Sequence, residues 1–291
     1  MTPLPAPHAV SRRAFLRRFA AAAILTPSLR GGFTIAADEK EFVPADFISV
    51  QKGDLPIIIS APHGGTMPIP GVPERHGEGM KTGGAGFFAG RDENTELLAA
   101  AIASEIETRL GKKPFFVIAK AHRKFVDANR PPEIGVEHPR AREVYDAYRG
   151  TLAKFCDEVQ TRFGRGLLID VHGQGSARDT VFRGTQNGAT DSMLSKLLGE
   201  KIHAGPQSFA GLLVAHDIKM KPTDTSAEAS GFTGGHIVQT YGKHEGIGAV
   251  QCEFGMDFRA KNAIKPTSEK VAAAIADFAK LYLLESVAGK K

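Results

Sequence analysis

Short apolar runs alternate with longer amphipathic stretches along the chain from residue 56 onward. Runs of about four to eight apolar residues are typical of buried strands, whereas apolar positions that recur about every three or four residues are typical of helices. The apolar runs predict strands over 56–61, 115–119, 166–171 and 250–254. The periodic stretches predict helices over 92–110, 140–162, 192–203 and 267–287. Strands that alternate with helices indicate one α/β domain, which we expect to be a three-layer α/β/α sandwich.

The segment between the first predicted strand and the first predicted helix is rich in glycine, with six glycines over 77–90. It lacks the GxxxxGK[ST] pattern of a phosphate-binding loop, so we expect a mobile surface loop without a catalytic role. Asp92, at the end of this segment, is suited to cap the N-terminus of the helix, and Gly111 is suited to end it.

The N-terminal residues resemble a twin-arginine export signal. Arg12 and Arg13 are followed by an aromatic residue and a leucine, and then by an apolar stretch over 19–25. The alternative is a membrane anchor. A membrane span needs about 20 mostly apolar residues, and this stretch is soon interrupted by Pro27 and Arg30. The pattern therefore favours export by the twin-arginine machinery.

Small residues near position 37 offer a cleavage site, so we predict a signal peptide over 1–37 and one mature domain over 38–291, located in the periplasm. The signal holds five arginines and no other charged residue. Without them, the 37 Lys and Arg fall to 32, which equals the 32 Asp and Glu. The mature domain is thus formally neutral, which argues against nucleic acid or a stable membrane association as partners.

Two cysteines, Cys156 and Cys252, are too few for a disulfide framework. A twin-arginine substrate folds in a reducing compartment before export, so we expect two buried free thiols. Cys252 adjoins Glu253 in a predicted strand, where neighbours point to opposite faces. If Glu253 faces a site, Cys252 faces away from it and is not a nucleophile.

Two histidines follow or end predicted strands, and this placement predicts a metal site. His63 comes directly after the first predicted strand, and His172 follows the third. Ligand sites of open α/β sheets lie at the carboxyl ends of the strands, where both side chains would meet. Hydrolytic zinc commonly takes three ligands from His and a carboxylate and keeps one position open for water. The third ligand is expected from Asp92 or Glu93, at the start of the following helix; for Asp92 the alternative is the helix cap.

A carboxylate and two arginines complete the candidate catalytic set. Glu253, on the last predicted strand, is the best candidate for a general base, because burial raises the pKa of a carboxylate toward working pH. Its alternative is an exposed strand residue. Arg123 and Arg130 are suited to hold a substrate carboxylate and to stabilise an oxyanion. Either could instead form a surface ion pair, with Asp127 as one partner. Asp170, two residues before His172, would orient its imidazole.

These stretches together resemble the N-formylglutamate amidohydrolase family, which is related to the zinc carboxypeptidases and aspartoacylases. The resemblance covers most of the mature chain. It is carried by SAPHGG at 60–65, RKFVDANR at 123–130, DVHG at 170–173, GGHIVQTYG at 234–242 and QCE at 251–253. It implies a phosphorylase/hydrolase-like α/β/α fold with a mixed sheet.

The resemblance also implies roles for individual residues. It makes His63 and His172 zinc ligands, Glu253 the base and Arg123 the cation that polarises the substrate carbonyl. It makes Asn129 and Arg130 the clamp on the substrate carboxylate. Two positions differ from the family pattern. Thr66 stands where the carboxypeptidases have a ligand Glu, which moves the third ligand to Asp92, and His236 stands among the substrate contacts where the family often has Tyr.

The expected function is that of an exported zinc-dependent amidohydrolase. Its substrate would be a small N-acyl amino acid, N-formyl-like, or a similar molecule that bears a carboxylate. Within enzymes, the alternative is a zinc carboxypeptidase or amidase that acts on peptidoglycan-derived peptides. A third possibility is a solute-binding or scaffold protein that keeps the fold without turnover, and the joint presence of His63, His172 and Glu253 argues against it.

Overall fold

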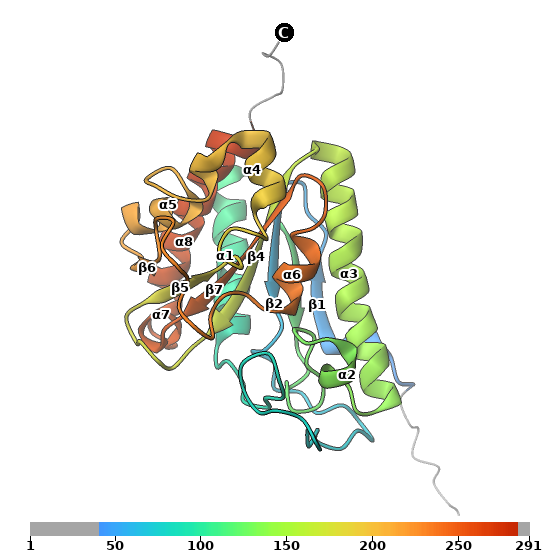
Figure 1. Cartoon of the computed structure of the whole chain (residues 1–291). Coiled ribbons are helices and arrows are strands. Elements are labelled where there is room, and N and C mark those ends of the chain that lie inside the picture. The colour runs from blue at the N-terminus through green and yellow to red at the C-terminus, as the bar shows by residue number, and fades with distance from the viewer. Residues whose placement is uncertain (1–40, 285–291) are drawn as a thin grey trace, which may run out of the picture. The chain divides into compact units, whose positions relative to one another are not determined.

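The computed structural model describes residues 41–284, and the predicted export signal over 1–37 lies outside the described residues. Residues 42–284 form a seven-stranded mixed sheet with helices on both faces (Figure 1). The predicted three-layer α/β/α architecture with a mixed sheet is therefore confirmed. Within residues 41–284, no helix is both long and apolar enough to cross a membrane.

The sheet brings the carboxyl ends of its central strands to one edge. The strands are β1 (Ile48–Gln51), β2 (Ile57–Ala61), β3 (Phe115–Ala119), β4 (Gly166–Gly173), β5 (Val181–Gly184), β6 (Met220–Lys221) and β7 (Ile247–Phe254). Their order is β1-β3-β2-β4-β7-β5-β6. The four central strands β3, β2, β4 and β7 are mutually parallel. At one end of the sheet, β1 runs antiparallel to β3. At the other end, β5 runs antiparallel to β7, and β6 runs parallel to β5. The residues that follow the four parallel strands consequently lie close together.

Helices cover the two faces of the sheet unequally. They are α1 (Thr95–Leu110), α2 (Pro132–Gly135), α3 (Pro139–Phe163), α4 (Ser192–Leu198), α5 (Phe209–Ala215), α6 (His236–Tyr241), α7 (Met256–Arg259) and α8 (Ile264–Phe278). Short 3-10 turns occur at Pro44–Phe47 and Glu200–Ile202, and a π-helical turn at Ala279–Leu283 extends α8. Helices α1, α4, α5 and α8 pack on one face, and α3 and α6 pack on the other (Figure 1).

Side-chain alternation in the strands produces two separate cores. In β4, Leu167, Ile169 and Val171 join the core under α1 and α8, whereas Leu168 joins the core under α3. Because successive side chains of a strand point to opposite faces, Asp170 and His172 share the face of Leu168. The α3 and α6 face therefore carries the polar groups of the site.

The predicted elements agree with the structure where their patterns are long. All four predicted strands are present, and the helix predicted over 140–162 is α3. The helix predicted over 192–203 is interrupted at Gly199, which has φ of 92°, and α8 starts three residues before its predicted start. The strands β1, β5 and β6 were not predicted; they are two to four residues long, too short for a periodic signal.

Asp92 does not cap α1, so this prediction is wrong. Asn94 precedes the first helical residue, and the Asp92 main-chain carbonyl accepts a hydrogen bond from the Thr95 hydroxyl at 2.8 Å. The carboxylate of Asp92 instead turns toward two histidines. Gly111 does end the helix, in the left-handed conformation that favours glycine.

Both cysteines are buried free thiols, as predicted. Burial raises the pKa of Cys156 and of Cys252 above the ordinary thiol value. Cys252 packs in the apolar core under α8, on the face opposite to Glu253. A buried thiol with a raised pKa has little thiolate at neutral pH, so neither residue is suited to be a nucleophile.

Candidate functional site

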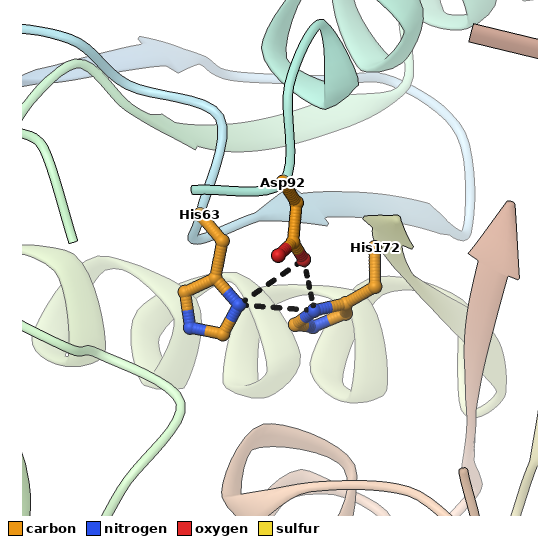
Figure 2. A group of neighbouring side chains, drawn as sticks. All are labelled: His63, Asp92 and His172. Atoms are coloured by element: carbon orange, nitrogen blue, oxygen red, sulfur yellow. Dashed lines mark hydrogen bonds and ion pairs between the residues drawn. The ribbon is translucent and has the colours of Figure 1, made fainter. Parts of the chain in front are cut away.

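Three side chains from separate parts of the chain converge at the carboxyl edge of the sheet (Figure 2). His63 follows β2, Asp92 precedes α1, and His172 lies near the end of β4. His63 Nδ1 lies 3.1 Å from His172 Nδ1 and 3.4 Å from Asp92 Oδ2, and His172 Nδ1 lies 3.1 Å from the same oxygen. All three residues are buried. Glu93, the alternative ligand, is exposed at the surface.

The two glycines after His63 allow this convergence. A Cβ on Gly64 would lie 2.4 Å from the Glu96 amide nitrogen, and a Cβ on Gly65 would lie 2.4 Å from the Ala121 carbonyl oxygen. The chain after β2 thus passes directly against α1 and the segment that follows β3, where only glycine fits. The Asp92 amide then donates to the His63 carbonyl at 3.1 Å, which holds the two residues together.

The far nitrogen of each imidazole is held by a buried carboxylate. His63 Nε2 lies 2.7 Å from Asp127 Oδ1, and His172 Nε2 lies 2.9 Å from Asp170 Oδ2. Asn129 Nδ2 also lies 3.1 Å from His172 Nε2. A carboxylate accepts a hydrogen bond from the Nε2 proton, and this contact turns Nδ1 of each imidazole toward the centre of the group. Histidine ligands of metals are commonly oriented in this way. The predicted orienting role of Asp170 agrees with this contact.

The three converging atoms match the demands of a tetrahedral cation. Ligand atoms at about 2.0–2.1 Å from zinc are about 3.3–3.4 Å apart at tetrahedral angles, close to the observed 3.1–3.4 Å. Burial would lower the pKa of His172, but the charge of Asp170 and its hydrogen bond outweigh burial and raise that pKa to about 10. Against the effect of burial, His63 and His172 hold the pKa of Asp92 well below its ordinary value. The site therefore favours a positive charge at its centre.

Asp127 links the first histidine to Arg123, and sequence reasoning missed this role. Its Oδ2 accepts a hydrogen bond from Arg123 Nε at 2.7 Å, while its Oδ1 faces His63. Although burial opposes ionisation, the charges of Arg123 and His63 hold the pKa of Asp127 well below its ordinary value. Arg123 also approaches Asp92 at 3.7 Å and stacks over Phe88 at 4.9 Å. The anticipated ion pair with Asp127 thus exists, but it is buried rather than at the surface.

Glu253 lies beside the histidines on the neighbouring strand. It is in register with His172 across β4 and β7, and both side chains border the same cavity. Burial raises the pKa of Glu253 to about 7, with a further contribution from the negative charge of Asp92. Gln251 Nε2 donates to Glu253 Oε1 at 2.8 Å, and Gln251 Oε1 accepts from the Gly235 amide at 2.7 Å. The backbone amide fixes the orientation of Gln251, which in turn holds Glu253. The alternative of an exposed strand residue is excluded, since Glu253 is buried.

One cavity of about 860 Å³ brings together every predicted site residue. Its lining includes His63, Asp92, Arg123, Asn129, Arg130, His172, His236 and Glu253. The glycine-rich loop, predicted to be a surface loop apart from the chemistry, also contributes residues 83–85 and Phe88 to the lining. The volume lies toward the upper end of the range of about 300–1,000 Å³ that is usual for small-molecule sites.

Asn129 and Arg130, which were predicted to contact the substrate, both form hydrogen bonds within the protein. The Asn129 amide donates to Gln251 at 3.4 Å and accepts from the Ile237 amide at 2.7 Å, so it holds the start of α6 in place. Arg130 donates to the carbonyls of Gly84, Gly86 and Asn129. No carboxylate within residues 41–284 lies within ion-pair distance of its guanidinium.

His236 occupies the first position of α6, and its side chain borders the cavity half-buried. Burial lowers the pKa of His236 to about 4, with a further contribution from the charge of Arg149. The imidazole is consequently neutral at physiological pH, and it offers a substrate a polar contact without a charge.

Two buried arginines that support the site were also missed. Arg259 donates to the carbonyls of Glu93, Phe254 and Gln174, and so ties the Asp92 loop to the ends of β4 and β7. Arg75 donates to the Arg123 carbonyl at 2.9 Å. Except for the Phe254 carbonyl, these main-chain acceptors lie 48 or more residues away in sequence, and no local pattern marks such contacts.

Comparisons with known proteins support the fold. The structure is similar to the crystal structure of N-formylglutamate amidohydrolase from Ralstonia eutropha JMP134, with a TM-score of 0.53 and 12% sequence identity over 81% of this chain and 98% of that chain. The crystal structure of gene product Atu2144 from Agrobacterium tumefaciens matches with a TM-score of 0.49 and 16% identity over 83% of this chain and 94% of that chain. No family model and no curated protein matches the sequence. At 12% identity, the likeness to the first of these structures establishes a shared fold only.

Proposed function

We propose that this chain is a zinc-dependent hydrolase that cleaves an amide bond of a small N-acyl amino acid or a similar carboxylate-bearing substrate. One observation carries the proposal: three ligand atoms converge within 3.1–3.4 Å, each histidine is oriented by a buried carboxylate, and Glu253 lies in the same cavity. The amidohydrolase named among the structural neighbours supports the same class of reaction.

The residues of the chain divide the chemistry among them. His63, Asp92 and His172 would hold the metal, which supplies Lewis-acid polarisation and lowers the pKa of water. Glu253, with its pKa raised to about 7, takes a proton from the attacking water and passes it to the leaving amine. Arg123 borders the cavity as a cation, suited to the developing charge on the substrate carbonyl oxygen.

Arg130 is the residue that favours a carboxylate-bearing substrate. Its guanidinium borders the cavity, and its bonds go to main-chain carbonyls rather than to acids. These three bonds use one N–H on each nitrogen of the guanidinium, and the nearest acidic groups, Asp127 among them, act on its charge only from beyond ion-pair distance. A guanidinium in this state binds a carboxylate by charge-assisted hydrogen bonds.

The volume of the cavity favours a second candidate. A cavity of about 860 Å³ is large for an N-formyl amino acid, so a zinc carboxypeptidase or amidase that acts on peptidoglycan-derived peptides is the alternative. The twin-arginine pattern supports export to the periplasm, with the export machinery as a partner, and either reaction is compatible with that location.

Metal analysis of purified variants tests the proposal. The wild-type protein should bind about one zinc ion per chain, and His172→Ala should lose the ion together with hydrolysis of N-acyl amino acids. His216→Ala is the matched control, because His216 also faces a carboxylate, Asp277 at 2.8 Å, but does not border the cavity. Equal zinc content in wild type and His172→Ala would remove this histidine from the ligands. A zinc-loaded protein that cleaves neither N-acyl amino acids nor short peptides would contradict the proposed reaction.

A further inference from the structure

One end of the cavity is lined without charged side chains. Beyond Glu253, the described lining residues come from 174–175, from Gln186 and from 231–234, and they are glutamine, glycine, threonine and phenylalanine. The other end, by contrast, holds Arg123 and Arg130. The two ends therefore suit different parts of one substrate, a charged part and an uncharged part.

An aromatic pair forms the base of the uncharged end. Phe182 on β5 lies directly opposite Glu253 on β7, so the two side chains share one face of the sheet. The Phe182 ring stacks on Phe232 with ring centroids 4.9 Å apart and an interplanar angle of 5°. Of this pair, Phe232 borders the cavity, and it is half-buried. A flat apolar surface consequently lies next to the proposed base.

The backbone that carries Phe232 is fixed by close packing. A Cβ on Gly184 would lie 2.6 Å from the Phe232 carbonyl oxygen and 2.6 Å from the Gly234 amide nitrogen. The Gln186 amide donates to the Thr233 carbonyl at 2.6 Å. Stacking on Phe182 therefore holds the Phe232 ring, and contacts with β5 and Gln186 hold its backbone. Such preorganisation is expected of a binding surface.

The sheet order gives the direction in which a bound substrate extends. Arg130 contacts the loop that follows β2, and Phe232 packs against β5. Strands β4 and β7, with His172 and Glu253, lie between them in the sheet. Neighbouring strands are about 4.8 Å apart, so about 10 Å separates β4 from β5. With the carboxylate at Arg130 and the scissile carbonyl at the histidines, the acyl group points across Glu253 toward Phe232.

Resting on the proposed function, we infer that Phe232 forms an acyl-group subsite and that the preferred substrates are N-acyl amino acids with an aromatic acyl group. A formyl group holds one carbon and leaves this end of the cavity unfilled. An aromatic acyl group reaches the Phe232 ring and stacks on it, as aromatic pairs do at centroid distances of about 4.5–7 Å. The size of the cavity and its uncharged lining at this end agree with a preference for such a group.

This inference is tested on the zinc-loaded protein with three compounds, which carry an aromatic ring in the acyl group, no aromatic ring, or an aromatic ring in the amino acid. They are N-benzoyl-L-glutamate, N-formyl-L-glutamate and N-formyl-L-phenylalanine. The wild type should favour N-benzoyl-L-glutamate over N-formyl-L-glutamate by about tenfold in kcat/KM. Phe232→Ala should lower kcat/KM for N-benzoyl-L-glutamate about tenfold, mainly through KM, and should affect N-formyl-L-glutamate much less. Phe163→Ala, the same change at a half-buried phenylalanine outside the cavity, should alter neither compound.

Two outcomes would overturn the subsite while leaving the proposed hydrolase intact. One is a Phe232→Ala variant that loses activity on N-formyl-L-phenylalanine and not on N-benzoyl-L-glutamate, which places the ring subsite on the amino-acid side. The other is a wild type that cleaves the formyl compounds faster than the benzoyl compound. If no compound is cleaved, the proposed reaction fails instead. Calorimetric binding of N-benzoyl-L-glutamate then decides the subsite, which is wrong if Phe232→Ala binds as tightly as the wild type.

Discussion

The two faces of the sheet are built from the same strands and both carry an apolar core, but β4 and β7 contribute polar groups to only one of them. On the face under α1 and α8, β4 and β7 contribute only apolar side chains and Cys252. On the face under α3 and α6, the same strands contribute Asp170, His172, Gln251 and Glu253, all of them buried. Burial of apolar area stabilises the fold on both faces, and only the face under α3 and α6 also holds the groups that could perform chemistry.

The polar face is tolerated because its groups are paired with one another. An isolated buried charge costs several kcal/mol, and partners with hydrogen bonds offset that cost. Asp127 is paired with His63 and Arg123, and Asp170 is paired with His172. Glu253 has one hydrogen bond, from Gln251, and burial raises its pKa instead. Glu253 is thus a carboxylate whose pKa lies near neutral pH, as a general base requires.

The largest expected effect is on turnover and comes from the polar face. Glu253→Gln keeps the size and the hydrogen-bonding capacity of the side chain but removes the base, so kcat should fall about 10²- to 10⁴-fold while zinc content stays at the wild-type level. Kinetics and metal analysis on the same preparation measure both quantities. Glu93→Gln is the control, since Glu93 is exposed beside Asp92. Comparable losses in the two variants would contradict the assigned base.

The pH dependence of activity checks the same residue. A general base works in its deprotonated form, and burial raises the pKa of Glu253 to about 7 when no cation is bound, so kcat/KM should fall as the pH is lowered below about 7. A bound cation attracts the carboxylate charge and moves this acid limb below 7. The limb should be absent from the residual activity of Glu253→Gln. A flat profile between pH 5 and 8 in the wild type would argue against Glu253.

The next effect is on stability and comes from the apolar face. Ile169→Ala removes a fully buried side chain from the core under α1 and α8, so the free energy of unfolding should fall by about 2–5 kcal/mol. Zinc affinity of the folded protein should remain unchanged, because Ile169 points away from the histidines. Denaturant unfolding measures the first quantity and zinc titration the second. Leu197→Ala, at a side chain that is 54% exposed, should change stability by less than about 0.5 kcal/mol.

The smallest expected effect is on zinc affinity, and it comes from Asp170, which is adjacent to Ile169 in β4 but points to the opposite face of the sheet. Asp170→Asn keeps the shape of the side chain and an acceptor for His172 Nε2 but removes the charge, so zinc affinity should fall about 10- to 100-fold. Unfolding measured with a chelator present should change little compared with Ile169→Ala. Asp277→Asn, the matched change beside His216, should leave zinc affinity unaltered. If Asp170→Asn instead unfolds the protein and spares zinc affinity, the division between the faces is wrong.

The sequence was most informative where its signals were local and long. The apolar runs predicted the central strands, and the order of these strands with the helices predicted the α/β class. The same runs predicted that His63, His172 and Glu253 lie at one edge, because each ends or follows such a strand. Asp92 could have been a ligand or a cap, and only the fold decided that its carboxylate faces the histidines.

The tertiary structure decided what depends on contacts between distant segments. The pairing of Asp127 with His63 spans 64 residues, and that of Asn129 with the start of α6 spans 108 residues. The short strand β5 carries no periodic signal, yet it places Phe182 beside Glu253 and supports Phe232. Hydrophobic periodicity fixes which residues are buried and on which face, because it follows from the geometry of one element. The partners of a buried polar group depend on how several elements pack together, so they emerge only in the folded chain.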